Sequence, residues 1–122
     1  MKKFTDLEVW NVCIALLKET YALTKRLPKE ELFGLTAQMR RCTVSILGNI
    51  AEGFGRYTFP DKANRYTIAR GECNELEAYF YAIVALDFVK EQDIQPALAL
   101  VSRGEKMLSG LISACRKQAG NM

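Results

Sequence analysis

The sequence of 122 residues contains no histidine. Histidine is the usual general base in enzymes, the commonest metal ligand and the side chain that titrates near neutral pH. Its absence excludes a histidine-based catalytic triad, a histidine-dependent zinc hydrolase and a bundle with Glu-x-x-His iron ligands. No glycine-rich phosphate loop or nucleophile elbow takes its place. The sequence therefore predicts a protein without catalytic activity, with no cofactor and no metal.

Long apolar runs are missing as well. The longest, residues 78–86, is about half of the ~20 residues that a membrane-spanning helix needs. The basic start of the chain is followed by Asp6 and Glu8 instead of the apolar stretch of a signal peptide. We therefore expect a cytoplasmic protein with no membrane partner. Its four cysteines, which form no Cys-x-x-Cys pair, would then stay reduced.

What the sequence does contain fits one folded domain. Hydrophobic residues make up 49% of the chain and charged residues 25%, and no linker divides residues 1–122. Apolar residues recur at three- and four-residue steps in four segments, at about 5–26, 30–53, 59–91 and 93–117. No segment alternates with period two. We therefore predict an all-α fold, an antiparallel up-down-up-down four-helix bundle with short loops.

The apolar spacing also predicts which side of each helix faces the core, and polar residues predict where helices begin and end. Thr5 with Glu8, and Thr58 with Asp61, have the spacing of N-terminal caps. Gly53 suits a C-terminal cap of the second helix. The expected core residues of the first helix are Leu7, Trp10, Ile14, Leu17 and Tyr21, and those of the third are Tyr66, Ala69, Cys73, Leu76, Phe80 and Ile83.

The second helical segment also has apolar residues on the side opposite its core. The third segment shows the same feature more weakly, and there the preference of alanine for helices is explanation enough. In the second segment Phe33, Val44 and Leu47 share one outer stripe, which favours a subunit interface and a homo-oligomer. The predicted interface residues are Phe33, Ala37, Val44, Leu47, Ala51, Gly71 and Ala78.

Cysteines and clustered carboxylates are the remaining candidates for chemistry. Free cysteine packs as a small hydrophobic residue, and Cys42, for example, lies on a core stripe. Glu72, Glu75 and Glu77 have near-helical spacing, which could place two carboxylates together for acid–base catalysis. Without a histidine to complete such a site, we interpret them as a solvated helix face.

The net charge of +3 is unevenly distributed. Residues 32–71 contain six basic and two acidic residues, a local net charge of +4. Arginine pairs with phosphate and stacks on bases, and aromatic residues add stacking surfaces. Phe54, Tyr57, Phe59 and Tyr66 are interleaved with the basic residues. The predicted phosphate contacts are Arg40, Arg41, Arg56, Lys62 and Arg65. Alternatively, Arg40 and Arg41 pair with acidic residues of a neighbouring subunit.

Several stretches in a fixed order resemble one protein family. They are Pro28, residues 31–35 (Glu-Leu-Phe-Gly-Leu), 38–41 (Gln-Met-Arg-Arg), 45–46 (Ser-Ile) and 49–53 (Asn-Ile-Ala-Glu-Gly), Arg56, the spacing Phe4-x-x-Leu7-x-x-Trp10, and residues 69–77 with Gly71, Glu75 and Glu77. The resemblance covers roughly residues 4–116. It is to the four-helix bundle proteins encoded by intervening sequences in bacterial 23S rRNA genes.

This resemblance implies a four-helix protomer assembled as a homopentameric ring. It also implies kinship with the accessory proteins of diversity-generating retroelements, which bind a reverse transcriptase and nucleic acid. Two interpretations stay open at this point. The protein is a homo-oligomer that binds RNA or another nucleic acid, or it is a protein-interaction scaffold, for example for a reverse transcriptase, whose arginines serve the subunit interface.

Overall fold

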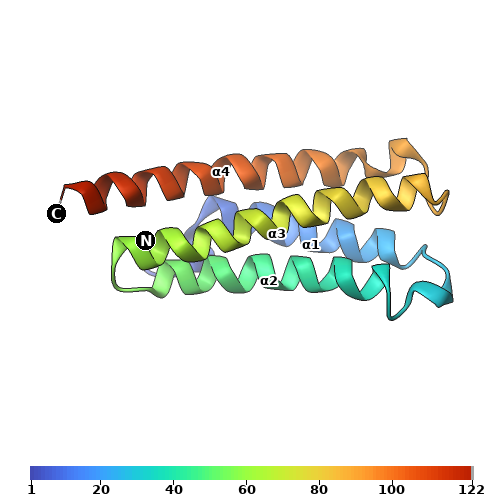
Figure 1. Ribbon diagram of the computed structural model, residues 1–122, viewed down its shortest axis with the longest axis horizontal. Coiled ribbons are helices and arrows are strands. Elements are labelled where there is room, and N and C mark those ends of the chain that lie inside the picture. The colour runs from blue at the N-terminus through green and yellow to red at the C-terminus, as the bar shows by residue number, and fades with distance from the viewer. Residues whose placement is uncertain (122) are drawn as a thin grey trace.

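Four long helices make up most of the chain in the computed structural model, which describes residues 1–121. They alternate in direction along the long axis of the molecule (Figure 1), and the described residues contain no strand. The prediction of an all-α, up-down-up-down bundle is confirmed. The helices are α1 (Glu8–Thr24), α2 (Leu35–Gly55), α3 (Phe59–Ala85) and α4 (Gln95–Gly120), with short 3-10 helices η1 (Phe4–Asp6), η2 (Lys29–Glu31) and η3 (Glu91–Ile94).

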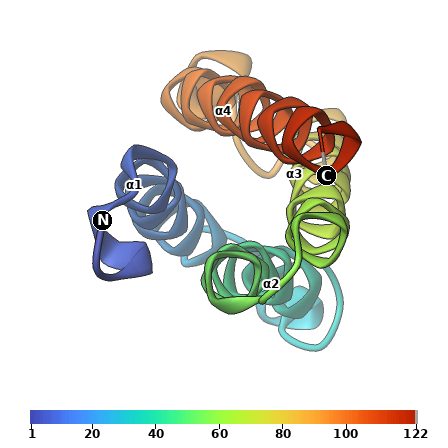
Figure 2. The ribbon, with the colours of Figure 1, turned by 90° about the vertical axis from the view of Figure 1, so that its left-hand side faces the viewer.

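Each long helix packs against the next one along the chain, and α4 returns to contact α1. Viewed along the axis, the four helices occupy the corners of a bundle (Figure 2). The contacts of α3 with α2 and α4 are more extensive than those of α1, the shortest of the four. None of the helices among residues 1–121 is long and apolar enough to cross a membrane.

The core of α3 agrees with the prediction, but that of α1 does not. All six predicted core residues of α3 are buried. In α1 the buried residues include Val9, Cys13, Leu16 and Thr20, whereas four of the five predicted residues are only half-buried. Thr20 tolerates burial because its hydroxyl donates a hydrogen bond to the Leu16 carbonyl oxygen at 2.8 Å. Helix α1 is thus apolar on two adjacent stripes, and the core covers only one of them.

The helix ends differ from prediction where a carboxylate competes for the backbone. Before α1, the Asp6 carboxylate accepts hydrogen bonds from the amides of Lys2 and Lys3, at 3.0 and 3.1 Å. The chain therefore turns through η1 and α1 starts at Glu8 without the predicted Thr5 cap. The predicted cap at Thr58 is confirmed, since its hydroxyl accepts a hydrogen bond from the Asp61 amide at 3.2 Å.

Helix α2 begins later than predicted. The Glu31 carboxylate accepts a hydrogen bond from the Leu35 amide at 3.0 Å, so the helix begins at Leu35 and not at residue 30. Phe33 therefore lies in the turn before α2. Gly53 is not a cap either, because α2 continues to Gly55.

Helix α3 ends at Ala85, six residues before the predicted end. Asp87 has a left-handed backbone, with φ of 63°. The amide of Asp87 donates to the Val84 carbonyl at 2.9 Å and that of Phe88 to the Ile83 carbonyl at 3.0 Å. This pattern is a Schellman motif, in which the left-handed position is usually glycine.

Replacing Asp87 with glycine should therefore stabilise the protein by about 0.5–1 kcal/mol, because glycine adopts positive φ without a Cβ penalty. Urea unfolding at fixed protein concentration measures the change. Asp87→Ala is the matched control and should not stabilise, since alanine keeps the Cβ. A lower unfolding midpoint for Asp87→Gly would contradict the role of the left-handed turn.

Candidate nucleic-acid and subunit interfaces

An apolar groove runs between α1 and α2 on the outside of the bundle. It has a volume of about 320 Å³ and is lined by Leu17, Lys18, Tyr21, Val44 and Leu47. The structure thus brings two predicted interface residues together with the second apolar stripe of α1. Val44 is 56% exposed and lies in the middle of α2.

The other predicted interface residues do not line this groove and lie on α2, in the turn before it, or on α3. Phe33 is 92% exposed in the turn before α2, and Ala37 is exposed in the first turn of the helix. Ala51 is half-buried, whereas Gly71 and Ala78 are exposed on α3. Leu17 and Tyr21 also line the groove, although their apolar spacing predicts that they belong to the core of α1.

Arg40, a predicted phosphate contact, joins α2 to α1. Its Nε donates a hydrogen bond to the Thr24 hydroxyl at 2.9 Å, and its guanidinium lies over the Tyr21 ring, 4.5 Å from the centroid. Such cation–π contacts stabilise a structure by roughly 0.5–2 kcal/mol. These two contacts place the Arg40 side chain between α1 and α2.

Arg41 faces α3 and contacts two of the glutamates that the sequence suggested were solvated. Its guanidinium pairs with Glu72 at 3.3 Å and with Glu75. The Cys42 thiol donates to the Glu75 carboxylate at 3.1 Å, and the Tyr79 hydroxyl donates to it at 3.2 Å. The hydrogen bond from Cys42 is the main reason that the pKa of Glu75 lies below its usual value. These residues form an ion-paired cluster that joins α2 to α3.

The thiol of Cys42 and the carboxylates of Glu72 and Glu75 have ligand atoms within 4.8 Å of one another. Three such atoms could hold a metal ion. Two features of the cluster oppose this use. Arg41 already supplies the compensating positive charge, and burial raises the pKa of the Cys42 thiol, which disfavours the thiolate that a metal needs.

Glu105 on α4 is a carboxylate that no sequence motif singles out. Its Oε1 is buried and has no hydrogen-bond partner among the described residues. Burial, and then the nearby Glu77 carboxylate, raise the pKa of Glu105. The ionised form is therefore disfavoured in the folded state.

Replacing Glu105 with glutamine should stabilise the protein by about 1 kcal/mol at neutral pH, because glutamine has no charge to bury beside Glu77. Because the pKa of Glu105 is raised in the folded state, the wild-type protein loses stability as the pH rises and this carboxyl group ionises. The advantage of Glu105→Gln should thus shrink below about pH 4, where glutamate is protonated in both states. Thermal melts between acid and neutral pH test this. An advantage that does not change with pH would contradict it.

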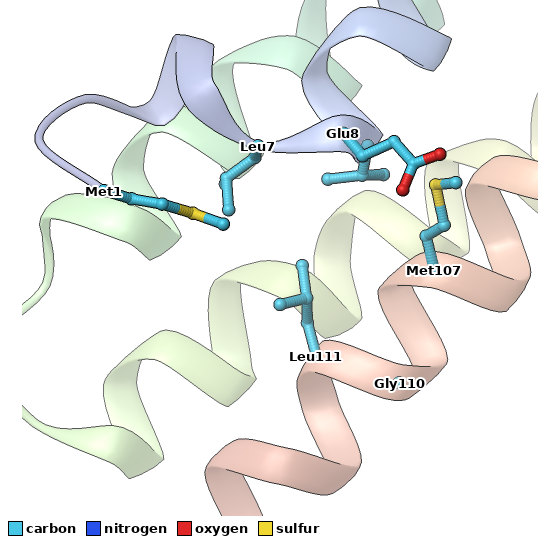
Figure 3. Close-up of a pocket in the computed structure, with 7 residues that line it drawn as sticks. Met1, Leu7, Glu8, Met107, Gly110 and Leu111 are labelled. Carbon is cyan, nitrogen blue, oxygen red and sulfur yellow. The ribbon is translucent and has the colours of Figure 1, made fainter.

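A second apolar groove, of about 300 Å³, lies between the start of α1 and α4 (Figure 3). Met1, Leu7 and Leu111 point into it. Its one carboxylate, Glu8, sits at the edge and pairs with Arg103 at 3.5 Å. The groove therefore offers apolar surface but no group arranged for acid–base or nucleophilic chemistry.

The three remaining predicted phosphate contacts meet where α2 ends and α3 begins. Arg56 and Arg65 both pair with Glu52, at 3.2 and 3.3 Å. The Lys62 ammonium donates to the Phe54 carbonyl at 2.6 Å, at the C-terminal end of α2. The predicted set thus divides into two arginines in the middle of the bundle and three basic residues at one end.

This end of the bundle, which we call the basic end, comprises residues 1–10, 50–66 and 114–121 (Figure 1). It contains seven basic and four acidic residues, a net charge of +3 that equals that of the whole chain. The opposite end, residues 24–36 and 84–96, contains four basic and five acidic residues. The folded protein is therefore polarised along its axis.

Comparison with known proteins places the chain in a family. A model described as 23S rRNA-intervening sequence protein matches residues 5–110. This chain belongs to that family. The resemblance seen in the sequence is thereby confirmed, whereas the kinship with retroelement accessory proteins stays a prediction. The matched residues of this 23S rRNA-intervening sequence protein include every predicted interface and phosphate-contact residue, but not Arg116 and Lys117 at the basic end.

A solved structure shares the fold of this family member. It is the crystal structure of a protein with unknown function from the S23 ribosomal protein family of Bacteroides thetaiotaomicron. The two are 22% identical in sequence, with a TM-score of 0.78 over 85% of this chain and 97% of that chain. Comparison with curated proteins gives no match.

Proposed function

We propose that this protein is a cytoplasmic, non-catalytic homo-oligomer, assembled as a pentamer, that binds RNA or another nucleic acid. The observation that carries the nucleic-acid binding is the concentration of the net charge of +3 at the basic end. Side-by-side packing of copies would bring several basic ends together and multiply their field. The family description names an rRNA context, which favours RNA as the nucleic acid.

The apolar groove between α1 and α2 supports the oligomer. Its walls carry Val44 and Leu47, and Phe33 is exposed near the start of α2. Burial of such surface contributes about 25 cal/mol for each Å² removed from water. A monomer would leave this surface in water, whereas a second copy would cover it.

The same groove supports the second candidate, a protein-interaction scaffold with a partner such as a reverse transcriptase. The two candidates differ in the role of the basic end. In a scaffold the groove is occupied by a different protein, and the basic end need not contact phosphate.

Fluorescence anisotropy of the wild-type protein with labelled RNA tests the proposed function. Between 50 and 200 mM salt the affinity should fall, with a log–log slope of about −0.7 for each phosphate contacted on a single strand. Arg56→Gln, at the basic end, should reduce this slope. Arg40→Gln, in the middle of the bundle, tests whether that arginine also contributes. Failure of the intact wild-type protein to bind RNA at low salt would contradict the proposal and favour the scaffold.

A further inference from the structure

The tip of the basic end presents one aromatic side chain fully to solvent. Tyr57 is 99% exposed and lies in the three-residue connection between α2 and α3. Its neighbours Arg56 and Thr58 have extended backbones, with ψ of 151° and 152°. The connection therefore holds the tyrosine outside the bundle, next to an arginine.

The other aromatic residues of this region serve the fold. Tyr66 is 3% exposed and belongs to the core. Phe54 and Phe59 are half-buried and pack against the core. Tyr57 alone among these four gives no packing to the bundle. A large amphipathic ring in this position suits a contact with another molecule.

Basic residues lie on several elements at the basic end, among them the connection between α2 and α3 and helices α3 and α4. Arg56 precedes Tyr57 in the chain. Across the end, Arg116 lines a depression of about 350 Å³ between the start of α3 and the end of α4, together with Asn64. Lys117 is exposed beside it on α4. The basic end thus combines the accessible ring of Tyr57 with several positively charged side chains, on a surface whose net charge is positive.

We propose that the basic end binds single-stranded nucleic acid, with one unpaired base stacked on the Tyr57 ring and phosphates of the same strand on Arg56 and Arg116. This site rests on the nucleic-acid binding proposed above and adds a strand type and a stacking residue. A single strand fits because its bases expose their faces, whereas the faces of bases in a duplex are covered by their neighbours. Base–aromatic stacking does not require a particular sequence.

Anisotropy with a single-stranded RNA of about 15 nucleotides and with the corresponding duplex tests this site. Tyr57→Ala should weaken binding of the single strand by about fivefold or more and change duplex binding much less. Tyr57→Phe keeps the ring and should bind as the wild type does. Tyr81→Ala is the matched control, because Tyr81 is also exposed, at 52%, on α3. Since Tyr57 packs against nothing, its variants should keep the wild-type melting temperature.

A second pair of variants tests the phosphate contacts. The double variant Arg56→Gln with Arg116→Gln should reduce the salt slope for the single strand by about 1.4, two contacts at about 0.7 each. The double variant Lys25→Gln with Lys29→Gln removes the same charge from the opposite end and should leave the slope nearly unchanged.

The outcomes separate this site from the proposed function. If the wild type binds RNA but Tyr57→Ala binds the single strand equally well, the stacking site is refuted and nucleic-acid binding stands. Equal losses for single strand and duplex would also refute it. If the wild type binds no RNA at low salt, both the function and the site are refuted.

Discussion

Replacing Gly53 with alanine is expected to destabilise the protein by about 1–3 kcal/mol. Gly53 lies inside α2 and faces the ring of Tyr66 on α3. A Cβ at this position would stand 2.6 Å from Cε1 and 2.8 Å from Cδ1 of that ring. Real carbon atoms do not approach so closely, so the ring or the helix would have to move. Tyr66 is buried, and the clash therefore outweighs the usual preference of alanine for a helix.

A matched control separates the clash from helix propensity. Gly110 lies in the middle of α4, and a Cβ there would meet nothing within 4 Å. Gly110→Ala should therefore stabilise the protein by about 0.5–1 kcal/mol. Urea unfolding of both variants at one protein concentration gives the two free energies. Stabilisation by both substitutions would show that Tyr66 does not pack against Gly53 as described.

Replacing Val44 with aspartate is expected to convert the proposed oligomer into monomers. Val44 lies in the apolar groove between α1 and α2. Burying a carboxylate between subunits has a large free-energy cost, because the lining of the groove is apolar apart from Lys18 and the Tyr21 hydroxyl. About half of the Val44 side chain is exposed to solvent in the single chain, so the fold of the subunit should tolerate the aspartate. Circular dichroism should thus remain that of the wild type.

Light scattering measures this change. The variant should have the mass of one chain, 13.8 kDa, at concentrations at which the wild type is assembled. Ser113→Asp, an exposed position on α4, adds the same charge away from the groove and should keep the wild-type mass. A Val44→Asp variant with the wild-type mass would place the subunit contact on another face.

The sequence was sufficient to predict the four helices. For α3 it also predicted which face of the helix is buried. The predicted core residues of α3, from Tyr66 to Ile83, are all buried, although this helix also carries apolar residues on its outer side. Helix α1 has two adjacent apolar stripes, and a buried threonine belongs to the stripe that faces the core. Which of the two stripes is buried depends on how the other helices pack against α1, and the sequence of α1 does not show this. The end of α3 could not be predicted from the sequence either, because Asp87, just after the helix, adopts a backbone conformation that is typical of glycine.

The partners of the arginines could not be predicted for a different reason. Arg41 meets Glu72 and Glu75, which are 31 and 34 residues away in the chain. Such a pairing depends on the register between α2 and α3, which apolar spacing does not specify. The local charge of the sequence therefore indicated a basic segment. In the folded protein part of that segment is paired with glutamates, and the net positive charge lies at the basic end.

The molar mass of the wild-type protein in solution tests most directly whether copies of this chain assemble and bring their basic ends together. Multi-angle light scattering at micromolar concentrations should give one species near five times 13.8 kDa. A single species of 13.8 kDa would contradict the oligomer, leave the groove between α1 and α2 without its proposed occupant, and remove the multiplied field on which strong RNA binding depends.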